Sequence, residues 1–127
     1  MAKSLWHWAP ALVWVAITFV VSNQPVVEIP FGAPDYVAHA GNSAVLGVLL
    51  IWARANGNWR AITPWVLASA VLLAIGLGIG DEFHQSFIPG RDSELRDVIA
   101  DAVGAGIAAT AVAVLVWAVK YRLDRRV

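Results

Sequence analysis

The amino-acid sequence predicts an all-α protein: a polytopic membrane protein built as a four-transmembrane-helix bundle, with both termini in the cytoplasm. Two observations predict this fold class. Of the 127 residues, 59% are hydrophobic and only 14% are charged, whereas a typical soluble domain is about half apolar and about a quarter charged. The apolar residues are also grouped in four runs, each near the ~17–25 residues with which a helix crosses the hydrocarbon layer.

The expected spans are residues 5–21, 37–53, 62–79 and 98–119, and we expect residues 1–127 to form a single domain. Helix is the required conformation, because lipid offers no hydrogen-bond partner to open backbone groups. A soluble bundle of very apolar helices is the alternative, but these runs lack the polar stripe of such helices. The first run follows Lys3, as in a signal peptide, yet no small-x-small cleavage site follows it, so we interpret it as a membrane anchor.

Turn-forming residues separate the runs. Asn56, Gly57 and Asn58 interrupt the chain after the second run, and Pro89-Gly90 forms a turn after the third. Asp92 or Ser93 is then expected to cap the fourth helix.

Basic residues and tryptophans predict the orientation. Only two of the nine basic residues, Arg91 and Arg96, lie on the side opposite the termini. The other seven are Lys3, Arg54, Arg60, Lys120, Arg122, Arg125 and Arg126. The positive-inside rule therefore predicts cytoplasmic termini. Six of the seven tryptophans lie near the same ends, as an interfacial belt does: Trp6, Trp8, Trp52, Trp59, Trp65 and Trp117.

Composition also excludes several classes of function. The chain has no cysteine, which excludes disulfides, thiol catalysis and zinc–thiolate sites. Nine acidic residues balance nine basic ones and no basic stripe is present, so we expect no nucleic-acid partner.

Acidic residues gather at the outer ends of the helices. Only Asp124 is on the cytoplasmic side; the other eight are Glu28, Asp35, Asp81, Glu82, Asp92, Glu94, Asp97 and Asp101. A carboxylate inside the membrane is costly, so it normally faces the bundle interior or a wet cavity and marks a functional site.

Helical spacing brings these groups together. The second, third and fourth helices each carry polar residues three, four or seven positions apart, which share one face of a helix. The sets are Asp35, His39 and Asn42; Asp81, His84 and Gln85; and Asp97 and Asp101. The second set requires the third helix to continue past its glycines. Three helices thus present polar faces at one depth, beside Arg91 in the loop.

Small residues predict where the helices approach closely. Gly76 and Gly80 are four residues apart, as are Ala100, Gly104 and Ala108. This spacing permits close helix contact in lipid.

The segment Asp81–Asp97, continuing to Asp101 and Gly104, resembles the VanZ-like family of small membrane proteins. That family carries an acidic pair, a glutamine, a Pro-Gly-Arg turn and a following aspartate in this order. Asp101 is a departure, because an asparagine is frequent there in the family.

Two earlier matches extend the resemblance over nearly the whole chain. Asp35 and His39 match an aspartate and a histidine four residues apart at the start of the second span, and Ser22 matches a serine that ends the first. The resemblance implies a link to the bacterial envelope. Together with the predicted orientation, we expect a multi-pass protein of the bacterial cytoplasmic (inner) membrane, with its polar site on the outer face. The founding member is associated with low-level resistance to teicoplanin, a lipid-bearing glycopeptide that binds cell-wall precursors.

From the spacing and the resemblance together we assign candidate roles. The candidate catalytic residues are Asp35, His39, Asp81, Glu82, Gln85, Asp97 and Asp101, and the candidate substrate-binding residues are Arg91, Ser22, Asn42 and His84. A carboxylate-oriented His39 suits a general base or a metal ligand, although a helix start explains Asp35 and His39 as well. Asp81 suits a proton donor.

Three of these residues have a structural alternative. Glu82 points away from the face of Asp81 and Gln85, which fits a solvated helix end, and His84 fits the outer interface. Arg91 either pairs with Asp97 or Asp101 or holds a phosphate.

A divalent metal is a candidate cofactor. The candidate ligands are Asp35, His39, Asp81 and Asp101, with His84 and Asp97 as further donors. Carboxylates favour Mg²⁺, Mn²⁺ or Ca²⁺, and histidines admit Zn²⁺. No HExxH signature is present.

Three functions fit these features. The first is a membrane-embedded hydrolase or transferase that acts on a lipid-linked phosphate or cell-wall precursor in the outer leaflet. The second is a non-catalytic binder of a lipid headgroup or lipoglycopeptide. The third is a small structural subunit of a membrane complex, for which homo-oligomerisation is the simplest form.

Overall fold

The computed structural model describes residues 5–25 and 30–125, and every regular element in these ranges is a helix. The helices are α2 (Ala9–Ser22), α3 (Asp35–Arg54), α4 (Pro64–Gln85) and α5 (Leu95–Asp124), with short 3-10 turns η1 (Trp6–Trp8), η2 (Pro30–Gly32) and η3 (Trp59–Ala61). The predicted all-α class is confirmed for this part of the chain. Lys3, Glu28 and Arg126, which entered the predictions of orientation and charge, lie outside the described residues.

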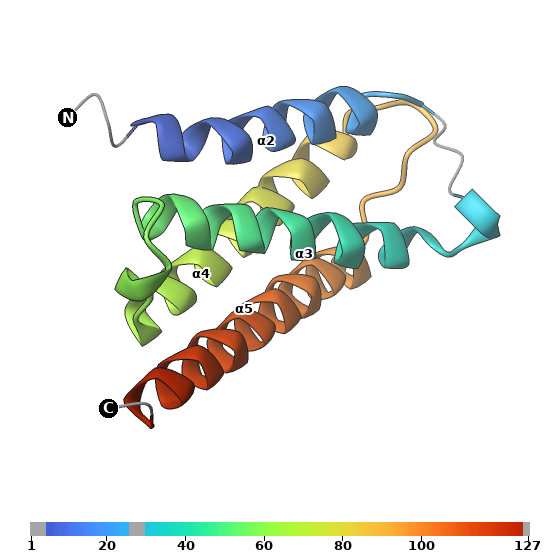
Figure 1. Cartoon of the computed structure of the whole chain (residues 1–127). Coiled ribbons are helices and arrows are strands. Elements are labelled where there is room, and N and C mark those ends of the chain that lie inside the picture. The colour runs from blue at the N-terminus through green and yellow to red at the C-terminus, as the bar shows by residue number, and fades with distance from the viewer. Residues whose placement is uncertain (1–4, 26–29, 126–127) are drawn as a thin grey trace.

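Successive helices run in opposite directions, so the first residues of α2 and the last residues of α5 lie at the same end of the bundle (Figure 1). α3 is the central helix: it packs against the other three and most extensively against α5, whereas α2 makes little contact with α4. The starts of α3 and α5 and the end of α4 meet at the opposite end. We call this the polar end.

Three of the helices, α3, α4 and α5, are long and apolar enough to cross a membrane, and the segment Trp6–Ser22 is a shorter apolar helix. Large aliphatic side chains face outward on three sides of the bundle: Leu12 on α2, Leu72 on α4 and Leu115 on α5 are all more than 60% exposed. Outward aliphatic side chains on long apolar helices fit a membrane protein, because lipid solvates them without cost.

The helices extend beyond the apolar runs at the polar end. α3 begins at Asp35 and not at residue 37, and α4 continues to Gln85 and not to residue 79. The fourth helix likewise begins at Leu95 and not at residue 98. Apolar runs underestimate these helices because their terminal turns carry the polar residues. α4 therefore continues past its glycines, as the polar spacing requires.

The expected cap at Asp92 or Ser93 is wrong. Glu94 occupies the N-cap position of α5 in an extended conformation, without a side-chain cap hydrogen bond. Its backbone N–H donates to Glu82 Oε2 on α4 at 2.9 Å. This bond fixes the loop and sets the start of α5 three residues before the apolar run.

The predicted turns are confirmed. Asn56 and Gly57 have positive φ of 50° and 69° between α3 and η3, and Gly90 has φ 83° between α4 and α5. Glycine adopts this left-handed conformation without the steric cost that other residues meet.

Close packing occurs at one of the two small-residue patterns. A methyl group on Gly104 would overlap the carbonyl oxygen of Ala40, and one on Gly47 would lie 3.2 Å from Ala108 Cβ, so α5 approaches α3 through its small residues. The prediction for Gly76 and Gly80 is wrong, because no atom would lie within 4 Å of a methyl group on either. The close glycine of α4 is Gly78, between them, whose added methyl would overlap the Asp101 carboxylate on α5.

Candidate functional site

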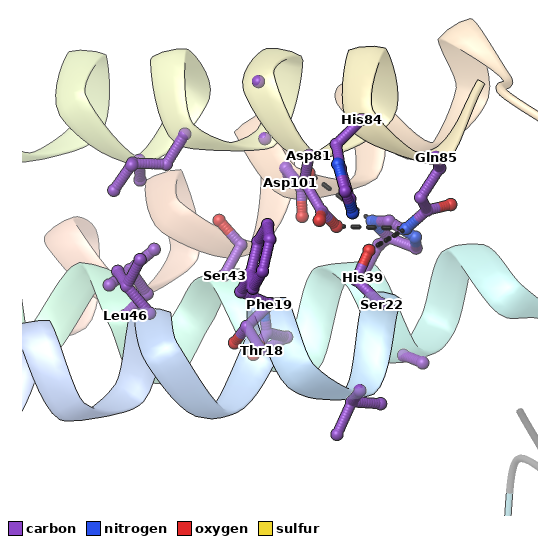
Figure 2. A pocket seen from close by; sticks show the side chains of 18 of the residues that line it. Thr18, Phe19, Ser22, His39, Ser43, Leu46, Asp81, His84, Gln85 and Asp101 are labelled. Carbon is purple, nitrogen blue, oxygen red and sulfur yellow. Dashed lines mark hydrogen bonds and ion pairs between the residues drawn. The ribbon is translucent and has the colours of Figure 1, made fainter. Parts of the chain in front are cut away.

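A pocket of about 500 Å³ lies between α2, α3 and α4, with Arg91 of the following loop and Asp101 of α5 also in its wall. Its wall is polar at the polar end, where it includes Asp35, His39, Asp81, Gln85, Arg91 and Asp101. Farther along the helices the wall is apolar and includes Trp14, Val15, Leu46, Ala74 and Leu77. Figure 2 shows the polar side chains of α3, α4 and α5 converging opposite Ser22 of α2. The pocket is therefore amphipathic along its length.

His39 lies at the centre of the polar group. It is buried at 8% exposure, and its two ring nitrogens face carboxylates on different helices. Nδ1 lies 3.5 Å from Asp101 Oδ2 on α5, and Nε2 lies 3.6 Å from Glu82 Oε1 on α4. The close approach of Gly78 to Asp101 helps to set this arrangement, because a larger residue would displace the carboxylate. The imidazole is thus oriented by acids from both sides.

Gln85 links α2 to α4. Its side-chain amide donates to Ser22 Oγ at 2.9 Å and to Asp81 Oδ2 at 3.0 Å (Figure 2). The spacing of four residues places Asp81 and Gln85 on one face of α4, as predicted. Gln85 is 1% exposed, and its Oε1 has no hydrogen-bond partner among the described residues.

Arg91 pairs with Asp35 and not with the expected Asp97 or Asp101. Its Nη2 lies 3.8 Å from Asp35 Oδ2. The reason is that Asp97 and Asp101 face the buried side of α5, whereas Asp35 lies at the rim of the pocket with a side chain 41% exposed. Arg91 also borders the pocket, so its guanidinium can reach both Asp35 and a bound group.

Glu82 is buried, and its interpretation as a solvated helix end is wrong. It is only 4% exposed, since α4 turns this side toward the start of α5. One oxygen accepts from the Glu94 backbone and the other faces His39. Glu82 supports the site from behind and does not border the pocket.

Asp97 lies on the same buried side. It is 2% exposed, and its Oδ1 has no hydrogen-bond partner among the described residues. With Asp35 and His39 it offers three ligand atoms that all lie within 4.8 Å of one another. This group contains two of the four residues predicted as metal ligands; Asp81 and Asp101 are not members.

Asp97, like Glu82, is not among the residues that line the pocket, whereas the remaining predicted residues are. Asn42 Oδ1 accepts from Thr18 Oγ1 at 3.0 Å. His84 Nε2 lies 3.3 Å from Asn23 Oδ1, and the His84 ring packs on Phe19 at 4.7 Å between centroids. His84 therefore joins α4 to the end of α2.

Two hydroxyl-bearing pocket residues were missed by sequence reasoning, Thr18 and Ser43. Each stands four residues from a predicted site residue, Thr18 from Ser22 and Ser43 from His39. The helical spacing used for the charged residues predicts them when it is applied to hydroxyls. Ser43 is 2% exposed, and its Oγ has no hydrogen-bond partner among the described residues.

Comparison with known proteins identifies the family. No curated protein and no solved structure matches the chain. The family model VanZ/LLP1 matches residues 7–117, a range that includes every polar residue of the pocket. This match confirms the resemblance carried by the segment from Asp81 to Asp101. The chain belongs to the VanZ/LLP1 family.

Proposed function

We propose that this protein is a multi-pass enzyme of the bacterial inner membrane that takes up a lipid-linked amphiphile from the outer leaflet and acts on its headgroup. The observation that carries this proposal is the amphipathic pocket: one wall region is acidic and basic, and the continuing region is apolar. A ligand that fills both regions has a polar head and a hydrocarbon tail.

The size and charge of the pocket support this ligand class. A volume of about 500 Å³ lies within the range of ~300–1,000 Å³ that is usual for small-molecule sites, enough for a headgroup and the first part of a lipid chain. Arg91 at the polar rim is suited to a phosphate, because its planar guanidinium offers paired donors. Lipid phosphates and lipid-linked cell-wall precursors meet both requirements.

The reaction we propose is hydrolysis or group transfer at the headgroup. The attacking hydroxyl, of water or of an acceptor, gives its proton to a pocket base, and the leaving oxygen receives a proton from an acid. We assign proton exchange with the ligand to two pocket groups, His39, which is oriented by Asp101, and Asp81, which accepts from Gln85.

The alternative is a binder without turnover, whose ligand is a lipid headgroup or a lipoglycopeptide such as teicoplanin. The hydrogen bonds from the Gln85 amide to Ser22 and Asp81 favour recognition as much as chemistry, since they already fix these side chains. A binder of this kind would also connect the protein to glycopeptide resistance.

Mass spectrometry of membrane lipids and cell-wall precursors tests the proposal. Cells that make the wild type are compared with cells that make Asp81→Asn or His39→Gln at matched abundance, with Asp92→Asn, an exposed loop carboxylate, as the control. We expect a species that is consumed or formed by the wild type and Asp92→Asn only. If cells with the wild type and cells with the variants have identical lipid inventories, while an envelope phenotype still depends on His39, the protein is a binder and not an enzyme.

The proposed topology of four spans with cytoplasmic termini has a separate test. The chain has no cysteine, so single cysteines can be introduced at exposed positions in two connections. We expect an impermeant maleimide to label Ser93→Cys in intact cells and to label Ala61→Cys only after lysis. Labelling of Ala61→Cys in intact cells would reverse the orientation.

A further inference from the structure

We infer that Asp35, His39 and Asp97 form a binding site for one divalent transition-metal ion, Mn²⁺ or Zn²⁺. The site lies at the polar end, between α3 and α5 and next to the pocket. Two carboxylates and one imidazole are a donor set that both ions accept.

The positions of the donors fit a single ion. One ligand atom from each residue lies within 4.8 Å of the other two. Donors bound at ~2.1 Å around a common ion lie roughly 3 to 3.5 Å apart. The longest of these separations therefore has to shorten by at most roughly 1.5 Å, which rotation of the side chains supplies without a change in the helices.

Asp97 gives a second, independent indication of a ligand. Its carboxylate is 2% exposed and Oδ1 has no hydrogen-bond partner among the described residues. A buried carboxylate oxygen without a partner is costly, because water has been removed and nothing has replaced it. A metal ion next to Asp35 and His39 supplies the missing partner.

The balance of buried charge points the same way. Among the described residues, Glu82, Asp97 and Asp101 are buried acids at the polar end, and His39 is the buried base that faces them. Arg91 is also largely buried, with a side chain 11% exposed, and its ion pair is with Asp35 at 3.8 Å. One divalent ion offsets the excess of carboxylates, which a protonated imidazole alone does not.

His39 also has the support that metal-binding histidines usually have. Its two ring nitrogens face Asp101 at 3.5 Å and Glu82 at 3.6 Å. Whichever nitrogen binds the ion, the other can donate its N–H to a carboxylate, which fixes the tautomer and the ring orientation. Asp101 and Glu82 are thus positioning residues for this site.

The ion would remain accessible. Asp35, with a side chain 41% exposed, gives solvent a route to the site, and three protein ligands leave coordination positions open for water or a headgroup oxygen. That last consequence rests on the proposed function, whereas metal binding itself does not. With His39 held by the metal, proton transfer at the headgroup falls to Asp81.

The test measures metal binding directly in purified full-length protein in detergent micelles. Apo protein is titrated with Mn²⁺ while the free ion is followed by electron paramagnetic resonance, and bound Zn²⁺ is quantified by elemental analysis after desalting. We expect the wild type to bind one ion per chain. Asp97→Asn and His39→Gln should each lower the metal affinity at least tenfold. Asp101→Asn should lower the metal affinity roughly 10–100-fold, because it removes the carboxylate that orients the imidazole. Asp92→Asn, which removes the same charge from an exposed loop position, should bind as the wild type does.

Variants are compared only where helix content and elution volume match those of the wild type. If Asp97→Asn fails to fold, Asp97→Glu takes its place. Asp97→Glu keeps a carboxylate and should retain most of the metal affinity. The inference is overturned if neither Mn²⁺ nor Zn²⁺ binds to the wild type at one ion per two chains or more. It is also overturned if Asp97→Asn retains the full affinity of the wild type. Metal binding without any change of lipid inventory would support this site and refute the proposed enzyme, so the two outcomes are distinguishable.

Discussion

Replacement of Gly104 by alanine should destabilise the protein and separate the two helices that hold the site. The added methyl group would lie 2.8 Å from the carbonyl carbon of Ala40 and closer still to its oxygen, whereas ordinary contact begins at 3.4 Å. Because both partners are helix backbone, α3 and α5 have to move apart by at least about 0.6 Å. Overpacking of this kind costs ~1–3 kcal/mol.

The same movement reaches His39 and Asp101, which stand next to the contact in the sequence. A shift of that size would lengthen the distance between His39 Nδ1 and Asp101 Oδ2 from 3.5 Å toward 4 Å and weaken this ion pair. We therefore expect Gly104→Ala to reduce stability and activity together.

Gly106→Ala is the matched control, because it lies on the same helix and its methyl group would meet no atom within 4 Å. Both variants gain helix propensity, up to ~1 kcal/mol in aqueous helices, so their difference isolates the contact with Ala40. The assay is equilibrium unfolding in mixed micelles, followed by tryptophan fluorescence. An unfolding free energy for Gly104→Ala equal to or above that of Gly106→Ala would refute the packing argument.

Three further predictions follow from the site. Gly78→Ala should displace the Asp101 carboxylate and lower the wild-type change in lipid inventory by at least tenfold. Gly80→Ala is the control and should leave this change unaltered, because its methyl group would meet nothing within 4 Å. Equal changes in the two variants would contradict the close approach of α4 and α5. Gln85→Leu should lower the unfolding free energy by ~1–3 kcal/mol, because it leaves Ser22 Oγ and Asp81 Oδ2 without their shared donor, whereas Ser22→Ala should lower it by only ~0.5–1.5 kcal/mol; chemical unfolding of both variants checks the order. Loss of the ion pair in Arg91→Ala should itself change stability by less than ~1 kcal/mol, since the pair is 3.8 Å long and its Asp35 side chain is 41% exposed, whereas the Arg91 side chain is 11% exposed. The variant should abolish the change in lipid inventory at normal protein abundance; a fall in abundance on immunoblots would instead favour a structural role.

The sequence predicted the residues of the site better than their partners. Intervals of three, four and seven residues correctly placed Asp35, His39 and Asn42 on one pocket-facing side of α3, because the geometry of a single helix determines which residues share a face. The same geometry correctly joined Asp81 to Gln85.

Contacts between helices could not be predicted in this way. Sequence spacing does not specify how far one helix rotates against another, so it did not reveal that Glu82 faces His39 or that Arg91 pairs with Asp35. It also selected Gly76 and Gly80 as close-contact positions, although Gly78 is the glycine that meets α5. The rotation of α4 decides the positions of Glu82 and Gly78, whereas the burial of Asp97 and Asp101 on α5 decides the partner of Arg91.

The attachment of α2 has a consequence for ligand exchange. α2 makes little contact with α4, and side-chain hydrogen bonds join them at the polar end, from Gln85 to Ser22 and between His84 and Asn23 at the end of α2. A headgroup that accepts from the Gln85 amide in place of Ser22 breaks that bond, at a net cost of ~0.5–1.5 kcal/mol. Occupancy of the pocket and the spacing of α2 and α4 are then thermodynamically linked. A ligand that breaks this bond favours separation of the two helices and thereby exchange with the surrounding bilayer. A ligand that leaves the bond intact favours the closed arrangement of the two helices.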